Sequence, residues 1–370
     1  MVKIRKSHTL PKSYSGRRRP APKKTTEIPV AWHWPDHPPF RLSGFAWYKQ
    51  ERLFRRLPLK PADPLRQPVD ELANHTAGGQ VSFTTNSRVI RLDADLAGPA
   101  ATDHMAATGT CGFDVYLGRP GRQHFYSVTR FGLAQSAYDV FVFQHAQATW
   151  RTFMINFPLY QGVCKLRIGL EKTARVKPPP PFALARPVII YGSSITQGGC
   201  ASRPGMAYSN ILSRRLNVEM INLGFSGNGQ AEPEVARTIA AIPDPALLVI
   251  DCEANCVNGL LEERLPGFIG ILRTAHPAVP ILLVSRIRFA GDLAHPENES
   301  IRKKQELFQR RLVERARQQG DRRIFFLSGR ELLGTDADEC TVDGVHATDL
   351  GFYRMAGAME PVIRRLLFHS

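Results

Sequence analysis

The C-terminal half of the chain alternates between strand-like and helix-like segments, and this alternation constrains the fold more than any other feature. Short apolar runs rich in β-branched residues are each followed by a segment with helical periodicity. The strands are predicted at 187–191, 218–223, 246–251, 279–285 and 323–327, and the helices at 208–216, 232–241, 260–275, 298–318 and 349–367. Apolar runs of this kind fit strands that are buried on both faces. The pattern therefore predicts a parallel sheet with helices on both sides, whose ligands bind beyond the carboxyl ends of the strands.

The preceding segment, from about residue 44 to 170, has short strands broken by turn residues. They are predicted at 80–85, 87–93, 113–117, 124–128, 150–156 and 163–170. With no convincing helix pattern between them, these strands indicate an antiparallel β-sandwich. The run Lys177-Pro-Pro-Pro-Pro-Phe182 favours polyproline II and predicts a stiff linker. We therefore predict a sandwich domain at 31–176, a linker at 177–186 and an α/β domain at 187–370.

The formal net charge of +16 is concentrated at the N-terminus. Nine positive residues precede the first acidic one, Glu27, and the remainder of the chain carries only +7. Residues 1–30 are also rich in Pro and Ser, so we predict a disordered basic tail. Charge alone allows a weak, salt-sensitive attraction to polyanions, and no specific nucleic-acid partner is predicted.

Membrane insertion, export and metal binding are not indicated by the composition. No apolar run approaches the ~20 residues of a membrane span, and the N-terminus lacks the apolar core of a signal peptide. A cytoplasmic location is expected, with secretion or a periplasmic location left open. Six cysteines in so long a chain do not form a disulfide framework. Cys252 and Cys256 have no neighbouring His or Cys to complete a metal site, so we expect free thiols, no metal and no other cofactor. The oligomeric state stays open.

Each predicted strand of the α/β domain is followed by a loop that carries polar side chains or glycines. Because the carboxyl ends of parallel strands share one edge of the sheet, these loops are expected to converge. In chain order they contribute Ser194, Gly227 in a glycine-rich run, Asn255, Arg286 with Arg288, and Asp343 with His346. Taken singly, each residue also has a structural interpretation as a turn, cap or surface position. Taken together, they are the groups that acyl transfer needs.

The chemistry explains these residue types. A serine hydroxyl is a weak nucleophile at neutral pH and needs a base within hydrogen-bond reach. His346 can serve Ser194 as that base, and Asp343 can hold the imidazole in the required tautomer. The oxyanion formed during attack needs hydrogen-bond donors. The candidates are the backbone amides of Ser194 and Gly227 and the side chain of Asn255.

Four blocks of this half resemble the SGNH (GDSL-type) hydrolases in their order and approximate spacing. The blocks are Gly192-Ser-Ser-Ile-Thr196, Asn222-Leu-Gly-Phe-Ser-Gly227, Asn255 and Asp343-Gly-Val-His346. The resemblance implies a flavodoxin-like three-layer fold with Ser194 as the nucleophile. It implies that Gly227 and Asn255 are oxyanion donors. It also implies that His346 and Asp343 complete a catalytic triad.

The upstream region resembles the β-sandwich that precedes the catalytic domain in one branch of this family. Gly112-Phe-Asp-Val-Tyr116 is similar to the Gly-x-Asp-Leu-Tyr signature of that branch, and Arg56-Leu-Pro58 is similar to it as well. The chain departs from the family in having a second serine, Ser193, where Asp is usual. Alignment on the following Ile-Thr favours Ser194 as the nucleophile, with Ser193 orienting the loop. The usual Gly-x-Asn-Asp is replaced by Glu253-Ala-Asn-Cys256, which keeps the Asn.

We expect a serine esterase that removes a small acyl group, acetyl before others, from a carbohydrate or similar polar substrate. The carbohydrate preference rests on the family branch, on a sandwich of a sort that often handles glycans, and on the lack of a visible apolar lid. A short-chain lipase or thioesterase and a non-catalytic glycan-binding protein with a vestigial triad are the alternatives. Nucleotide binding by the Gly224–Gly229 loop is a weaker hypothesis, because the spacing of its glycines differs from that of dinucleotide-binding loops. Arg286 and Arg288 fit either a substrate clamp or a solvated basic pair.

Overall fold

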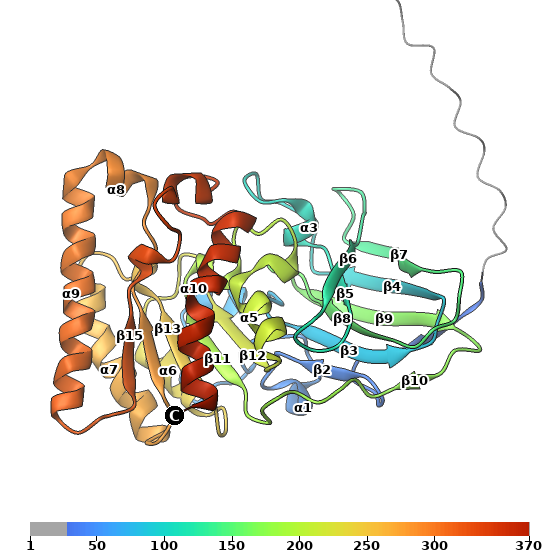
Figure 1. Ribbon diagram of the computed structural model, residues 1–370, viewed down its shortest axis with the longest axis horizontal. Coiled ribbons are helices and arrows are strands. Elements are labelled where there is room, and N and C mark those ends of the chain that lie inside the picture. The colour runs from blue at the N-terminus through green and yellow to red at the C-terminus, as the bar shows by residue number, and fades with distance from the viewer. Residues whose placement is uncertain (1–27, 370) are drawn as a thin grey trace, which may run out of the picture.

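The computed structural model describes residues 28–369. Residues 1–27, most of the segment predicted to be a disordered tail, lie outside the described residues. Val30, the last residue of that predicted tail, already begins the first strand. Figure 1 shows antiparallel sheets on one side of the molecule and a sheet flanked by helices on the other.

Two antiparallel sheets form the N-terminal region and pack their apolar faces together, as predicted. The first has the order β1-β9-β4-β7, with β1 at Val30–His33, β9 at Val163–Glu171, β4 at Val89–Leu96 and β7 at Ala137–Gln144. The second has the order β10-β3-β8-β5-β6, with β10 at Val176–Lys177, β3 at Gln80–Thr85, β8 at Arg151–Asn156, β5 at Asp114–Leu117 and β6 at His124–Val128. Strand β2, Arg41–Ser43, pairs with β3 at the edge. Three short helices also lie in this region: α1 at Tyr48–Glu51, α2 at Gln67–Leu72 and α3 at Ala107–Thr110.

The C-terminal region is a five-stranded parallel sheet of the order β12-β11-β13-β14-β15, the flavodoxin-like order. The strands are β11 at Val188–Gly192, β12 at Met220–Gly224, β13 at Leu247–Asp251, β14 at Ile281–Val284 and β15 at Ile324–Leu327. The helices are α4 at Ser194–Gln197, α5 at Tyr208–Leu216, α6 at Pro233–Ala240, α7 at Leu260–Ala275, α8 at Ala290–Ala294, α9 at Pro296–Gln318 and α10 at Asp349–Phe368. Single 3-10 turns lie at η1 Pro204–Met206, η2 Glu253–Asn255, η3 Gly329–Glu331 and η4 Ala337–Cys340. No helix within residues 28–369 has the length and apolar character needed to cross a membrane.

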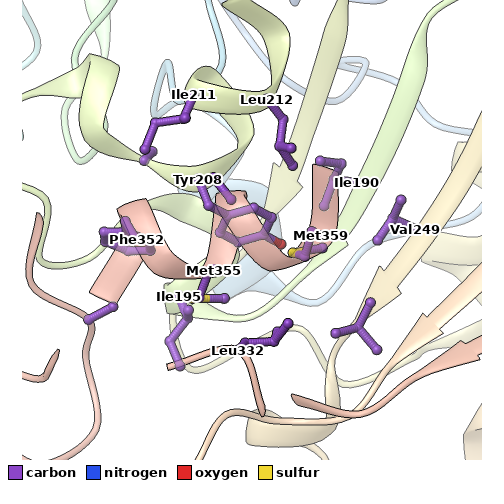
Figure 2. Packing of buried hydrophobic residues seen from close by; sticks show 14 of the residues in the cluster. Ile190, Ile195, Tyr208, Ile211, Leu212, Val249, Leu332, Phe352, Met355 and Met359 are labelled. Carbon is purple, nitrogen blue, oxygen red and sulfur yellow. The ribbon is translucent and has the colours of Figure 1, made fainter. Parts of the chain in front are cut away.

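Alternate residues of the interior strand β11 enter two different cores, because successive side chains of a strand point to opposite faces. Ile190 packs with α5 and α10, and Figure 2 shows it beside Tyr208 and Met359. Ile189 and Tyr191 pack in the core that α6, α7 and α9 cover on the other face. Burial on both faces explains why the strand is apolar throughout.

The predicted helices and strands of the α/β region are confirmed to within about two residues, but several short elements were missed. Strand β7 lies in a stretch for which no strand was predicted, and it completes the first sheet by pairing with β4. The expectation of a helix-free N-terminal region was wrong for α1, α2 and α3. Helices of four to six residues are too short to show an apolar period. Helix α8 was missed for the same reason, as was the short helix α4, in which Ser194 lies.

Asp114 of the Gly-x-Asp signature run links the two regions. Its side chain is fully buried. One carboxylate oxygen accepts from Asn156 Nδ2 at 2.7 Å, and the other accepts from Arg203 Nη1 at 2.9 Å and from the Gly205 amide at 2.8 Å. Because Arg203 and Gly205 lie in the segment that leads into α5, this carboxylate holds the sandwich against the α/β region.

Arg56 makes a second link between the regions. Its fully buried guanidinium donates to the carbonyl oxygens of His75 at 2.8 Å, Leu72 at 2.7 Å and Gly224, the last residue of β12. It also lies over the Phe225 ring, 4.8 Å from the centroid. Burial lowers the pKa of Arg56 to about 9, which leaves it a cation at neutral pH.

Replacing Arg56 with Ala should therefore destabilise the protein strongly. The change leaves buried carbonyl oxygens without donors, and we expect the free energy of unfolding to fall by about 3 kcal/mol or more. Urea titration followed by circular dichroism measures the loss. Arg52→Ala, which removes an exposed arginine paired with Asp36, is the control and should cost under about 1 kcal/mol. Equal losses in the two variants would contradict the role given to Arg56.

Candidate active site

Ser194 stands at the first helical position after β11. Ser193 is the N-cap of α4, and its hydroxyl accepts a hydrogen bond from the Ile195 amide at 3.3 Å. The turn requires glycine at 192, since a Cβ there would lie 2.2 Å from Thr196 Oγ1 and 2.3 Å from the Asp251 carbonyl oxygen. The structure thus separates the two serines: Ser193 orients the turn, and the Ser194 hydroxyl faces His346.

Asp343 and His346 lie on one tight loop between η4 and α10. An isolated bridge between Thr341 and Ala347 closes the loop, and Gly344 turns it with a φ of 86°. One oxygen of Asp343 accepts from the backbone amide of His346 at 2.7 Å. The other lies 2.7 Å from His346 Nδ1. The Asp343 side chain thus bonds both the backbone and the ring of His346, and these two bonds fix the orientation of the imidazole.

The Ser194 hydroxyl completes the chain of hydrogen bonds. Its Oγ lies 2.8 Å from His346 Nε2, and only 6% of the residue is exposed. For Asp343, partial burial is outweighed by hydrogen bonds from the His346 ring and from backbone amides, and its pKa falls to about 2. The carboxylate is thus ionised at neutral pH and accepts the Nδ1 proton, so that Nε2 is free to accept a proton from the serine.

The candidate oxyanion donors lie on three loops beyond the strand ends. Within residues 28–369, the amides of Ser194 and Gly227 have no hydrogen-bond acceptor. Gly227 has a φ of 69°, a conformation that favours glycine, and a Cβ there would meet nothing within 4 Å. Asn255 accepts from the Gly229 amide through Oδ1 at 3.2 Å, which leaves its Nδ2 as the available donor.

Residues of the N-terminal region contact the segment that carries Ser194. The sequence did not indicate whether this region contributes to the site. Tyr160 donates to the Ser194 carbonyl oxygen at 3.1 Å. His75 lies 3.0 Å from the side-chain amide of Gln197, the last residue of α4. His104 reaches the site itself, with its ring centroid 5.4 Å from that of His346. It stands on a loop outside the motif blocks, so no local sequence signal marks it.

Arg286 lines a cavity that Asp343 also lines, and Arg288 is not part of its lining. Arg286 forms a bidentate pair with Asp292 at 2.7 and 2.8 Å and is only 8% exposed. The guanidinium thus binds Asp292 of α8 and stabilises the position of that helix. Arg286 is therefore not part of a solvated basic pair. Arg288 is half-buried, and its Nε is buried without a partner among the described residues.

An apolar cavity of about 810 Å³ lies beside the Asp343 loop. Residues that follow β13 and β14 form its walls together with the start of α9. Its apolar lining includes Ala254, Val257, Phe289 and Ile301. Asp343 also lines the cavity, and the lining residue Ala254 directly precedes Asn255.

Two buried carboxyl groups lie under this loop cluster. Asp251, at the end of β13, accepts from Tyr208 Oη at 2.9 Å and from Thr196 Oγ1 at 3.0 Å. Burial raises the pKa of Asp251 to about 7, although these two hydrogen bonds act to lower it. Burial likewise raises the pKa of Glu253 to about 7.

These raised pKa values predict that stability falls as pH rises from about 4 to about 7. In this range the unfolded carboxyls have lost their protons while the folded ones retain them, so the folded state binds more protons and raising the pH favours unfolding. Above pH 7 the penalty is constant, on the order of 4 kcal/mol per group. Asp251→Asn should remove about half of this pH dependence, as measured by urea unfolding at pH 4.5 and 7.5. An unchanged slope in the variant would contradict the assignment.

Comparisons with known proteins cover both regions of the chain. Residues 185–364 match the GDSL-like lipase/acylhydrolase family, and residues 30–176 match the N-terminal GxDLY domain of SGNH-hydrolase-type esterases. No match was found among curated protein sequences.

Three solved structures resemble this chain along 91% of its length. A protein assigned as a GDSL-like lipase from Bacteroides ovatus is 31% identical, with a TM-score of 0.83, and the match covers 91% of this chain and 98% of that one. The salicylyl-acyltransferase SsfX3 from a tetracycline biosynthetic pathway is 17% identical, with a TM-score of 0.71 and coverage of 91% and 97%. A family two carbohydrate esterase from Cellvibrio japonicus is 16% identical, with a TM-score of 0.57 and coverage of 91% and 98%.

At 17% and 16% identity, the last two similarities show a shared fold and no more. The first similarity, together with the two family matches, extends over the sandwich and the α/β region alike. The chain therefore belongs to the GDSL-like lipase/acylhydrolase family and carries the N-terminal GxDLY domain of SGNH esterases.

Proposed function

We propose that the protein is a serine esterase that hydrolyses short acyl esters, acetyl esters before others, of a carbohydrate or similar polar substrate. The observation that carries the proposal is the unbroken chain from Ser194 Oγ to His346 Nε2, 2.8 Å, and from His346 Nδ1 to Asp343, 2.7 Å. The family supports ester hydrolysis. The resemblance of the fold to carbohydrate esterases is consistent with the polar substrate.

The proposed reaction has two halves. Ser194 Oγ attacks the ester carbonyl carbon while His346 Nε2 takes the hydroxyl proton, and Asp343 stabilises the imidazolium that forms. The amides of Ser194 and Gly227 and the side chain of Asn255 donate to the negative oxygen of the tetrahedral intermediate. His346 then returns its proton to the leaving alcohol, which gives an acyl-enzyme. A water molecule, deprotonated by His346, releases the acid and regenerates the serine.

The apolar cavity favours a second candidate, an esterase or thioesterase for larger apolar acyl groups. A cavity of about 810 Å³ is far larger than an acetyl methyl requires, and Val257, Phe289 and Ile301 offer it an apolar lining. The same fold serves a salicylyl-acyltransferase, which carries a bulky aromatic acyl group. The two candidates differ in acyl-group size.

A series of p-nitrophenyl esters with acyl chains from acetyl to octanoyl, together with acetylated sugars, tests the proposal. We expect kcat/KM to be highest for acetyl and to fall with chain length. Ile301→Trp, which narrows the cavity, should then leave acetyl hydrolysis unchanged, as should the control Leu307→Trp elsewhere on α9. If kcat/KM instead rises with chain length and only Ile301→Trp reverses the trend, the second candidate holds. Failure to react with a fluorophosphonate probe would contradict both and favour a non-catalytic glycan-binding protein.

A further inference from the structure

A second cluster of reactive side chains lies against the proposed catalytic histidine. His104, Cys200 and His346 each offer one ligand atom, and these atoms lie within 4.8 Å of one another. The three come from distant parts of the chain: the loop before α3, the turn after α4 and the Asp343 loop. The proposed esterase reaction uses neither His104 nor Cys200.

Both histidines are oriented in the same way. His346 Nδ1 lies 2.7 Å from Asp343, and His104 Nδ1 lies 3.0 Å from Asp103. A carboxylate at Nδ1 accepts the proton there, so each ring presents an unprotonated Nε2. Histidines that bind metals are held in this way, with the second ring nitrogen donating to a carboxylate or carbonyl.

The thiol and the local charge suit a cation. Cys200 is free and buried, and its backbone amide donates to the Ala347 carbonyl at 3.1 Å, which anchors it to the loop that bears His346. Two imidazoles and a thiolate are a ligand set for borderline-soft divalent ions such as Zn²⁺. The carboxylates of Asp103 and Asp343 offset part of the charge that such an ion brings.

We propose that His104, Cys200 and His346 form a binding site for Zn²⁺ or Cd²⁺ that inhibits the enzyme. Zn–N bonds of about 2.0–2.1 Å and a Zn–S bond of about 2.3 Å require the ligand atoms to draw together by roughly 1 Å. The exposed side chain of His104 supplies this movement. Binding displaces the thiol proton of Cys200 to solvent and leaves a coordination position for water.

Inhibition is expected because His346 would be both the general base of the esterase reaction and a ligand of the cation. This part of the inference rests on the proposed function. A cation bound to Nε2 takes the lone pair that would accept the Ser194 proton. The serine then has no base, and the acyl-enzyme does not form. Removal of the cation by a chelator restores the lone pair, so the inhibition is reversible.

Titration of the full-length protein with Zn²⁺ tests the inference. Hydrolysis of p-nitrophenyl acetate should fall with added Zn²⁺ and recover with EDTA. His104→Ala and Cys200→Ser should each raise the concentration for half-inhibition more than about 10-fold, since even the loss of a second-shell partner typically costs about 10- to 100-fold in affinity. The controls are Cys164→Ser, which removes the exposed thiol, and His295→Ala, which removes an exposed histidine paired with Glu297. Both should leave the inhibition unchanged.

Direct binding separates this inference from the proposed function. Cd²⁺ should give a thiolate-to-metal charge-transfer absorption in the wild type and in Ser194→Ala, and none in Cys200→Ser. Binding without any esterase activity would contradict the proposed function and leave the site standing. Normal esterase activity with no Cd²⁺ absorption, or with equal Zn²⁺ inhibition in His104→Ala, Cys200→Ser and wild type, would overturn the site.

Discussion

Replacing Ser194 with Ala is expected to abolish ester hydrolysis. The change removes the only hydroxyl within hydrogen-bond reach of His346 Nε2 among the described residues, 2.8 Å away, and leaves the fold intact because the side chain is small and its neighbours keep their contacts. Removal of the serine of a comparable triad costs on the order of 10⁶-fold in kcat. Turnover of p-nitrophenyl acetate and labelling by a fluorophosphonate probe should both disappear.

Ser193→Ala is the matched control, since it changes the neighbouring serine in the same way. Ser193 caps α4 through its bond to the Ile195 amide, so its loss should lower stability by about 1 kcal/mol. Activity should stay within about tenfold of the wild type. If Ser193→Ala abolished hydrolysis while Ser194→Ala retained it, the assignment of the nucleophile would be wrong.

Asp343→Asn has the second largest expected effect, a loss of about 10⁴-fold in kcat. The backbone determines this outcome. One Asp343 oxygen accepts from the amides of Val345 and His346, at 3.0 and 2.7 Å. The carbonyl oxygen of the Asn must take that place, so its NH₂ group faces His346 Nδ1 and donates to it. The imidazole then carries its proton on Nε2 and cannot accept the proton of Ser194.

A pH profile distinguishes this mechanism from simple misfolding. Because the pKa of Asp343 is about 2, its carboxylate is ionised at every pH at which the protein is assayed, and wild-type activity should show no acid limb from this group above about pH 3. The variant should be inactive across the same range, although circular dichroism should show it to be folded. Asp338→Asn, an exposed change on the preceding turn, should behave as the wild type. Near-normal kcat in Asp343→Asn would remove Asp343 from the mechanism.

The stability of the loops also depends on residues of the N-terminal region. Arg56 donates to the end of β12, and Tyr160 donates to the Ser194 carbonyl oxygen, so the sandwich supports the loops that carry the nucleophile and Gly227. The effect of Arg56→Ala on stability, predicted above, should therefore be accompanied by reduced activity at temperatures well below unfolding.

The fold and the main candidates could be read from the chain because their causes are local. Burial on both faces requires an apolar strand such as β11, and a tight turn requires Gly192, so both leave a signature in consecutive residues. Family blocks at the strand ends identified Ser194 and His346 before any geometry was known.

Contacts between distant segments decided the rest, since a contact leaves no mark in either segment alone. Only the tertiary structure pairs Arg286 with Asp292, places an apolar cavity beside Asp343 and brings His104 to the ring of His346. The sequence by itself determined which groups stand at the ends of the strands, because strand order and polarity are properties of neighbouring residues. The tertiary structure alone decided which of those groups are free to react, because this depends on which partners the folded chain brings within hydrogen-bond distance.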